Sequence, residues 1–280
     1  MRETWIQTRE QYIKYFLPAL TNLMMGEPEL ACDCEGVNLS RNGTLTHLQI
    51  SIKSLGSHTF VLCMRNLGTD ILHTPGCFGQ SLASVLESPH IQQLWNDVRN
   101  DSDALFSHYV RLGKVRDVQL MECAGRYGVR ERIVSLRQCV RQYGDRFWSR
   151  QELRNWMRGK DEGKLFFTLN GYQVLEDNPL PTQVAMYIAG DVACLFKLHV
   201  VLEKRMKTAA EVLKMPEQEL FSLVDRESIE RLRESCSANY NPTGPDKSMA
   251  PIAFQQMEVV DIFRGASTDD RDSWLELLPL

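Results

Sequence analysis

The sequence predicts an α/β fold in which a mixed central sheet is flanked by helices and followed by a helical extension at the C-terminus. Three strand patterns come first, at residues 29–36, 45–52 and 59–64. Asn42-Gly43 between the first two is typical of a hairpin turn. Strand and helix patterns then alternate, and a long apolar helix is predicted from 182 to 206, with Pro181 suited to its first turn. This order of elements favours a sheet with helices packed on it.

The remaining elements follow from local patterns. Residues 12–17 predict a short amphipathic helix with Thr8 as its N-cap. Between the third strand and the long helix we expect a helix at 80–87, a strand at 91–95, a helix at 103–112 capped by Asp101 or Ser102, and a strand from 115 that runs into a helix by 120. Another amphipathic helix is predicted at 217–234, and the Ser, Asn, Pro, Gly and Asp residues beyond Ser235 favour a loose tail.

Length and composition are those of a globular protein. The chain has 280 residues, of which 43% are hydrophobic and 24% charged. We expect one domain over residues 1–207 and, at 208–280, a helical extension with a flexible acidic tail. No apolar run approaches the roughly 20 residues that span a bilayer, and the first residues lack the apolar core of a secretory signal. These features predict an intracellular protein, in nucleus or cytoplasm, without a membrane partner.

The eight cysteines are scattered along the chain. None forms a Cys-x-x-Cys pair, and no histidine cluster lies at zinc spacing. Most lie in apolar runs, where a free thiol packs as a small hydrophobic group. Neither a disulfide framework nor a zinc site is expected.

The charges are unevenly distributed, although the net charge is only −4. Residues 126–164 hold eleven Lys and Arg against five Asp and Glu, whereas residues 217–280 hold thirteen acids against six bases. Aromatic residues are interleaved with the bases of the first segment. That pattern suits a single nucleic-acid strand, through phosphate contacts and base stacking. It suits equally a solvated helical face whose aromatics belong to the core.

Two carboxylates lie at the end of the first predicted strand. Asp33 and Glu35 are two residues apart, so on a strand both project from the same face. Like charges this close repel, and one tends to be protonated unless a cation lies between them. A strand that simply ends in a polar turn would show the same pair.

Two further acidic positions stand out. Asp191 follows Tyr187 by four residues and falls on the apolar stripe of the long helix, where an aspartate needs a partner or a metal. An ordinary hydrogen bond to tyrosine or arginine would also satisfy it. Asp103 opens a middle helix, where an acid commonly serves as a cap.

Together these positions resemble the DEDDy family of 3′–5′ exonucleases, over roughly residues 8–205. The family combines an acidic pair on a first strand, an aspartate on a middle helix and Tyr-x3-Asp on a late helix. The surrounding residues are closest to the Egalitarian-like group, related to ribonuclease D and the Werner exonuclease domain: Asp33-Cys34-Glu35-Gly36-Val37, Asp97-Val98-Arg99-Asn100-Asp101-Ser102-Asp103-Ala104-Leu105, Val115-Arg116-Asp117-Val118-Gln119-Leu120 and Pro179-Leu180-Pro181.

This resemblance implies a ribonuclease H-like fold and a 3′–5′ exonuclease acting on single-stranded nucleic acid, RNA favoured over DNA. It implies that Asp33, Glu35, Asp103 and Asp191 hold two Mg²⁺ or Mn²⁺ ions, while Tyr187 orients the attacking water or assists its deprotonation. The residue before Tyr187 is Met186 and no histidine lies nearby, which disfavours the histidine variant of the family. The expected nucleic-acid contacts are Arg99, Arg146, Trp148 and Arg150.

Other classes of function remain open at this point. Members of the Egalitarian-like group can lose metal ligands and serve as RNA-binding adaptors or dimeric scaffolds. A non-nuclease metal-binding or structural domain is a third class, which predicts no nucleic-acid affinity at any salt concentration. The acidic tail, which ends in Trp274-Leu275-Glu276-Leu277-Leu278, is predicted to dock on a protein partner or a second copy, or to fold back on the basic segment.

Overall fold

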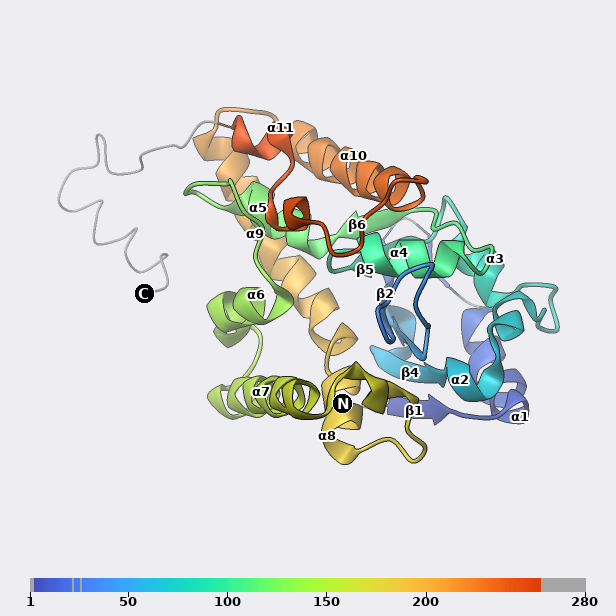
Figure 1. Ribbon diagram of the computed structural model, residues 1–280. Helices are drawn as coiled ribbons and strands as arrows, with labels where there is room; N and C mark the ends of the chain where they lie inside the picture. Colours follow the sequence, from blue (N-terminus) through green and yellow to red (C-terminus); the bar gives the residue numbers. More distant parts are fainter. Residues whose placement is uncertain (1–2, 22, 26, 258–280) are drawn as a thin grey trace.

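The computed structural model describes residues 3–21, 23–25 and 27–257 (Figure 1). In that part of the chain one mixed sheet has the strand order β1-β4-β3-β2-β5-β6. Its strands are β1 Glu3–Ile6, β2 Pro28–Glu35, β3 His47–Ile52, β4 His58–Cys63, β5 Gln92–Trp95 and β6 Val115–Asp117. Within it β3 runs antiparallel to both neighbours, and the other pairs are parallel. The carboxyl ends of the other strands therefore meet at one edge of the sheet.

The predicted strands are confirmed, and one was missed. β1 pairs in parallel with β4 at the edge of the sheet. Its four residues are too few to show a periodic pattern. Asn42-Gly43 lies in the connection between β2 and β3, which is closed by the Thr44 N–H donating to the Val37 carbonyl at 3.0 Å. This connection is longer than the two-residue hairpin that an Asn-Gly pair usually makes.

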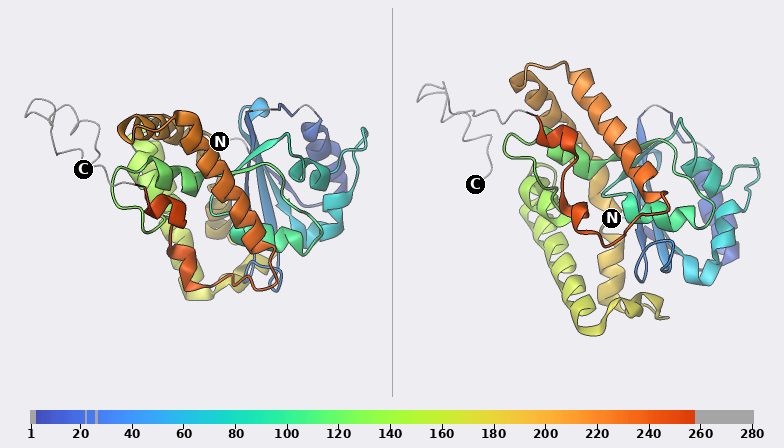
Figure 2. Two further views of the ribbon diagram at one scale, coloured as in Figure 1. Left: turned by 90° about the horizontal axis from the view of Figure 1, so that it is seen from above. Right: turned by 45° about the horizontal axis from the view of Figure 1, so that its top comes forward.

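Helices cover both faces of the sheet. They are α1 Arg9–Gln11, α2 Met64–Leu67, α3 Leu82–Leu86, α4 Arg99–Phe106, α5 Val118–Gly125, α6 Leu136–Tyr143, α7 Arg150–Asn170, α8 Thr182–Ala189, α9 Leu195–Val212, α10 Glu217–Ser235 and α11 Ile252–Gln255. In Figures 1 and 2 the helices α1 and α3 lie on one side of the sheet, and α5, α9 and α10 lie on the other. The two larger apolar cores lie one on each side, and a third, smaller cluster joins Val61 of β4 to residues of α7 and α8.

The alternation of side chains along β2 decides which face carries its acids. Leu30, Cys32 and Cys34 belong to the core under α3, whereas Ala31 belongs to the core under α5 and α9. Since strand residues two apart share a face, Asp33 and Glu35 project toward the α9 side. They lie where β2 emerges from the core, half-buried.

Helix α4 begins at Arg99, four residues earlier than predicted, and neither Asp101 nor Ser102 caps it. The carboxylate of Asp117, at the end of β6, accepts hydrogen bonds from the N–H groups of Asp97 at 3.0 Å and Val98 at 3.1 Å. A residue distant in sequence thus satisfies the backbone that leads into the helix. Because these N–H groups are bound by a residue distant in sequence, no neighbouring side chain caps the helix, and the sequence offers no local sign of where it begins.

The long apolar helix predicted from 182 to 206 is interrupted. α8 ends at Ala189, a 3₁₀ turn occupies Val192–Cys194, and α9 then continues to Val212. By length and composition this stretch, Thr182–Val212, could cross a membrane, contrary to the expectation from the sequence. More than half of its most apolar window (56%) is buried inside the structure, which is typical of a core helix in a soluble fold.

The described chain beyond α10 is folded against the body, contrary to the loose tail predicted after Ser235. Phe254 of α11 is fully buried, and the Ala250 N–H donates to the Glu131 carbonyl at 2.9 Å. Residues 258–280, with the predicted acidic tail end, lie outside the described residues. The predicted boundary at 207/208 falls inside α9, and α10 packs on α4 and α5.

Candidate metal centre

Three carboxylates converge at the carboxyl edge of the sheet. Asp33, Glu35 and Asp191 each offer one oxygen, and these atoms all lie within 4.8 Å of one another. Two come from the end of β2, and the third comes from the junction between α8 and α9. Among the described residues these three form the one such group of potential metal ligands found. The eight cysteines are free thiols and take no part in it.

The break between α8 and α9 places Asp191. Its backbone N–H donates to the Ile188 carbonyl at 3.2 Å, which ends α8 in a tight turn. The Gly190 carbonyl accepts a hydrogen bond from the Trp156 indole N–H of α7 at 3.0 Å. The turn Val192–Cys194 then contacts β2 and β3. An uninterrupted helix would have kept this carbonyl in its own hydrogen-bond ladder.

The electrostatics of the group favour a retained proton or a bound cation. Burial, reinforced by the charge of Asp191, raises the pKa of Asp33 well above its ordinary value. Burial and the same neighbour raise the pKa of Glu35 to about 8. Burial also raises the pKa of Asp191. Three partly desolvated carboxylates cannot all ionise near neutral pH unless positive charge joins them.

Lys160 of α7 supplies positive charge to this group. Its ammonium forms an ion pair with Asp191 and donates to the Tyr187 carbonyl at 3.0 Å. The side chain is only 7% exposed. In the sequence, Lys160 is one of many bases in a helical segment, and no local signal distinguishes it.

Asp101, rather than Asp103, faces the acidic group. Its carboxylate accepts the backbone N–H of Cys34 at 2.8 Å, between the two acids of β2. Its charge contributes to the raised pKa of both Asp33 and Glu35, and burial raises its own pKa to about 7. Adjacent helix positions differ by about 100°, so residues two apart point in nearly opposite directions. Only one of the two aspartates can face β2.

Asp103 is occupied elsewhere. Its carboxylate accepts the backbone N–H of Arg41 at 2.8 Å and forms an ion pair with the Arg41 guanidinium. That guanidinium also donates to the carbonyls of Ser235 and of Ser237, the latter at 2.9 Å. Asp103 thus holds the β2–β3 connection against the end of α10. The structure does not bring it into the group that the sequence predicted for it.

Tyr187 packs beside the acids, as its spacing from Asp191 indicated. Its ring lies edge-on to Phe167, with centroids 5.2 Å apart, and against Gly163 of α7. A Cβ at Gly163 would come within 2.5 Å of this ring. Burial and the nearby charge of Asp191 raise the pKa of Tyr187, so its hydroxyl stays protonated.

The four residues predicted to contact nucleic acid differ in their exposure to solvent. Arg99 is buried, and its guanidinium binds Asp97 at 2.6 and 2.9 Å and the Lys247 carbonyl at 2.8 Å. The protein itself therefore surrounds this side chain. Arg146 and Arg150 are exposed, whereas the half-buried Trp148 packs on Phe147 and Trp156.

Aromatic residues of the basic segment lie mostly in the interior. Tyr143 is fully buried and Trp156 is 8% exposed, both in the core beneath α5 and α9. Phe147 and Trp148 pack against the same core. For these residues the structure favours a helical face with core aromatics over a stacking surface. The exposed arginines remain compatible with phosphate contacts.

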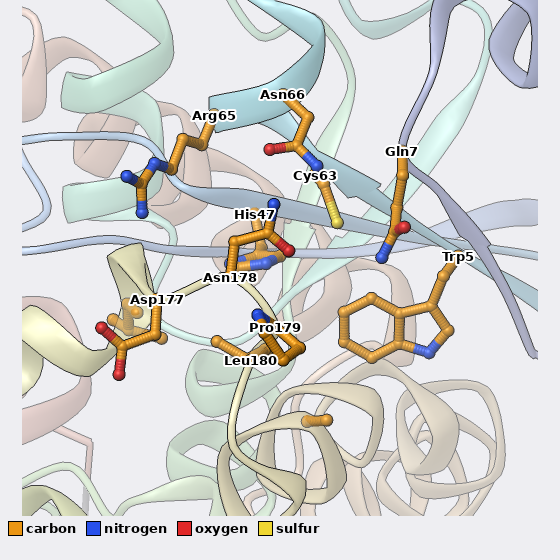
Figure 3. Close-up of a pocket in the computed structure, with 12 residues that line it drawn as sticks. Trp5, Gln7, His47, Cys63, Arg65, Asn66, Asp177, Asn178, Pro179 and Leu180 are labelled. Atoms are coloured by element: carbon orange, nitrogen blue, oxygen red, sulfur yellow. The ribbon is translucent and has the colours of Figure 1, made fainter.

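A pocket opens at the same edge of the sheet. It has a volume of about 270 Å³ and is lined by the ends of β1 and β4 and by the segment that leads into α8. Figure 3 shows the Trp5 indole and the Gln7 amide on one side, with Arg65 on another. His47, also in the lining, is the register partner of Glu35. The pocket therefore adjoins the strand that carries the acidic pair.

Several solved structures share this fold, although no known sequence family matches the chain. No protein-family model and no curated protein sequence matches the chain. Among solved structures, Trypanosoma brucei RNase D in complex with RNA U12 is similar with a TM-score of 0.66 and 18% identity, over 91% of this chain and 78% of that one. Escherichia coli RNase D, an exoribonuclease involved in structured RNA processing, has a TM-score of 0.56 and 15% identity, over 85% of this chain and 52% of that one.

A smaller protein shares the same arrangement. Brucella melitensis NrnC with bound Mg²⁺ is similar with a TM-score of 0.50 and 17% identity, over 86% of this chain and 99% of that one. At these identities the comparisons establish the fold. They confirm the predicted ribonuclease H-like α/β architecture with a mixed sheet between helices.

Proposed function

We propose that this protein is a 3′–5′ exonuclease that hydrolyses single-stranded RNA from its 3′ end. The observation that supports it best is the convergence of Asp33, Glu35 and Asp191 at the carboxyl edge of the sheet. This edge is where α/β folds place their ligands. The fold is shared with RNase D, and one of the similar RNase D structures is a complex with RNA.

We also propose that the protein resembles the Egalitarian-like group of these exonucleases, from the residues around Asp33 and Asp101. An intracellular location is a further proposal.

The donor set fits hard divalent cations. Its ligands are carboxylate oxygens, which suit Mg²⁺ or Mn²⁺. Asp33, Glu35 and Asp191, together with Asp101 in the place that the sequence had given to Asp103, would hold two ions. Such ions, when bound, lower the pKa of a coordinated water and stabilise the leaving oxygen. NrnC, which shares the fold, binds Mg²⁺.

Tyr187 would act through its hydroxyl in the protonated form. Burial, with the charge of Asp191, raises its pKa, which favours the neutral phenol over a phenolate at neutral pH. The hydroxyl instead orients the attacking water by hydrogen bonding. Gly163 and Phe167 hold the ring in place for this task.

The strand would approach along the pocket beside Glu35. Trp5 offers a ring for base stacking, while Gln7 and Asn66 offer amides that hydrogen-bond base edges. Arg65 in the same lining, and Arg146 and Arg150 on the basic segment, offer positive charge to phosphates. These groups suit an unpaired strand whose bases are accessible.

A second candidate is an RNA-binding adaptor with weak or no catalysis. The ion pair between Lys160 and Asp191 favours it, because an ammonium already neutralises part of the acidic group. Such a protein would retain the pocket and the exposed arginines. A protein partner or a second copy bound through the C-terminal extension belongs to the same proposal.

Degradation of a 5′-labelled RNA and its DNA counterpart, with Mg²⁺ or Mn²⁺, tests both candidates. A ladder that shortens from the 3′ end, and disappears in Asp33→Ala and Asp191→Ala, is the result expected of the exonuclease. Intact substrate with a persistent gel shift would instead identify the adaptor. No binding at any salt concentration would exclude both and leave a structural domain.

A further inference from the structure

Lys160 lies buried against the acidic group. The Nζ atom lies 3.6 Å from the centroid of the Tyr187 ring and donates to the Tyr187 carbonyl at 3.0 Å. It also forms the ion pair with Asp191 and lies 5.7 Å from the centroid of the Trp156 ring. Together these contacts place the ammonium between α7 and the segment that carries Tyr187 and Asp191. A lysine with these contacts differs from one on a solvated helical face.

The packing of α7 explains why the ammonium stays there. Trp156, four residues before Lys160, donates its indole N–H to the Gly190 carbonyl. Gly163, three residues after it, lies against the Tyr187 ring. Residues three and four apart share a helix face, so one face of α7 is docked on α8 by contacts on both sides of Lys160. The aliphatic stem is buried with it.

The charge of Lys160 reaches all three converging carboxylates. It is paired with Asp191, whose carboxylate oxygen lies within 4.8 Å of those of Asp33 and Glu35. A divalent metal at this position would place its positive charge beside the same three carboxylates. The ammonium therefore performs, in part, the electrostatic task of a metal ion.

We propose that Lys160 is a built-in cation that competes with the metal for Asp191, so that the divalent ion binds only by displacing this ion pair. The inference rests on the proposed metal-dependent function. Its consequence is a centre that stays folded without metal and binds metal more weakly than its carboxylates alone would. The flexible four-carbon stem of lysine allows the ammonium to withdraw while α7 remains docked.

Calorimetric titration of the metal-free, full-length protein with Mn²⁺ tests this competition. In Lys160→Met the charge is lost and the length of the side chain is nearly kept. We expect its Kd for Mn²⁺ to fall by about tenfold or more, and the rise in Tm on adding Mn²⁺ to be larger than in the unsubstituted protein. The matched control is Lys164→Met, one turn along α7 and exposed, which should leave both quantities unchanged.

The outcomes separate the competition from the metal centre itself. Equal or weaker Mn²⁺ binding in Lys160→Met would overturn the competition and leave the centre intact. No Mn²⁺ binding in any of the proteins would overturn the centre, and with it the proposed function as well as this inference. Should Lys160→Met not fold without metal, Lys160→Gln retains a donor for the Tyr187 carbonyl and is subject to the same titration and the same expected result.

Discussion

The carboxylate of Asp101 accepts the backbone N–H of Cys34 at 2.8 Å, which joins helix α4 to the strand that carries Asp33 and Glu35. Cys34 lies between these two acids, so the bond places a fourth carboxylate beside them. Asp103, two positions further along α4, instead pairs with Arg41. These two aspartates of one helix therefore have separable roles, one in the candidate centre and the other in packing.

Asp101→Asn should abolish most exonuclease activity. The amide oxygen keeps an acceptor for Cys34, while the negative charge is lost. We expect kcat to fall by about a hundredfold or more, because metal ligation supplies several kcal/mol of transition-state stabilisation. Asp103→Asn is the matched variant, and it should lower Tm through its pair with Arg41 while kcat stays near that of the unsubstituted protein. The opposite pattern of kcat would restore the role that the sequence predicted for Asp103.

Gly163→Ala should displace the ring of Tyr187 and lower kcat. A Cβ at this position would approach the ring to within 2.5 Å, so the ring or the helix must move. Displacement of a catalytic group by about 1 Å can lower the rate by about a hundredfold. Gly159→Ala on the same helix meets nothing within 4 Å and should instead raise stability by about 0.5–1 kcal/mol. Equal kcat in the two variants would show that catalysis does not depend on where the Tyr187 ring lies.

Trp5→Ala should weaken RNA binding through the pocket beside Glu35. Loss of one stacked base lowers affinity by about tenfold. Fluorescence anisotropy with a labelled single-stranded RNA measures this change, at one fixed salt concentration. Phe78→Ala removes an aromatic ring that is 81% exposed and outside the pocket lining, and it should have no effect. An unchanged Kd in Trp5→Ala would remove the pocket from the path of the strand.

Neutralising Arg146 and Arg150 together should reduce the salt dependence of RNA binding. Each phosphate contact that is lost lowers the slope of log K against log salt by about one. The double variant with glutamine at both positions is compared with Arg233→Gln, whose side chain is 70% exposed on α10. The expected result is a shallower slope in the double variant alone. A parallel slope in all three proteins would mean that the basic segment is only a solvated face.

The metal-free protein should lose stability as the pH rises. Burial, with the charge of Asp191, raises the pKa of Glu35 from its ordinary value of 4.5 to about 8, so the folded state retains a proton that the unfolded state has released. Stability therefore falls between these two pH values when metal is absent. Mg²⁺ or Mn²⁺ should raise Tm most at the upper end of the range, because binding requires ionised ligands. Thermal unfolding with and without chelator measures both trends, and a flat profile in chelator would contradict the first.

The sequence by itself determined five of the six described strands, the alternation of their side chains and most of the acidic group. Asp33 and Glu35 share a face because strand side chains alternate, and Tyr187 and Asp191 lie four residues apart on an apolar stripe. These are local periodicities, and a sequence displays them directly. The resemblance to DEDDy exonucleases followed from the same residues, and the fold it implied is the one observed.

Only the tertiary structure decided which neighbours these residues meet. The choice of Asp101 over Asp103 follows from the packing of α4 on β2, where Asp101 accepts the Cys34 N–H. The carboxylate of Asp117 accepts the N–H groups before α4. The burial of Arg99 depends on Asp97 and on the Lys247 carbonyl. Lys160 reaches Asp191 because α7 packs on α8. Apart from the Arg99–Asp97 pair, each of these contacts joins residues far apart in the chain, so its partner cannot be identified from local pattern alone.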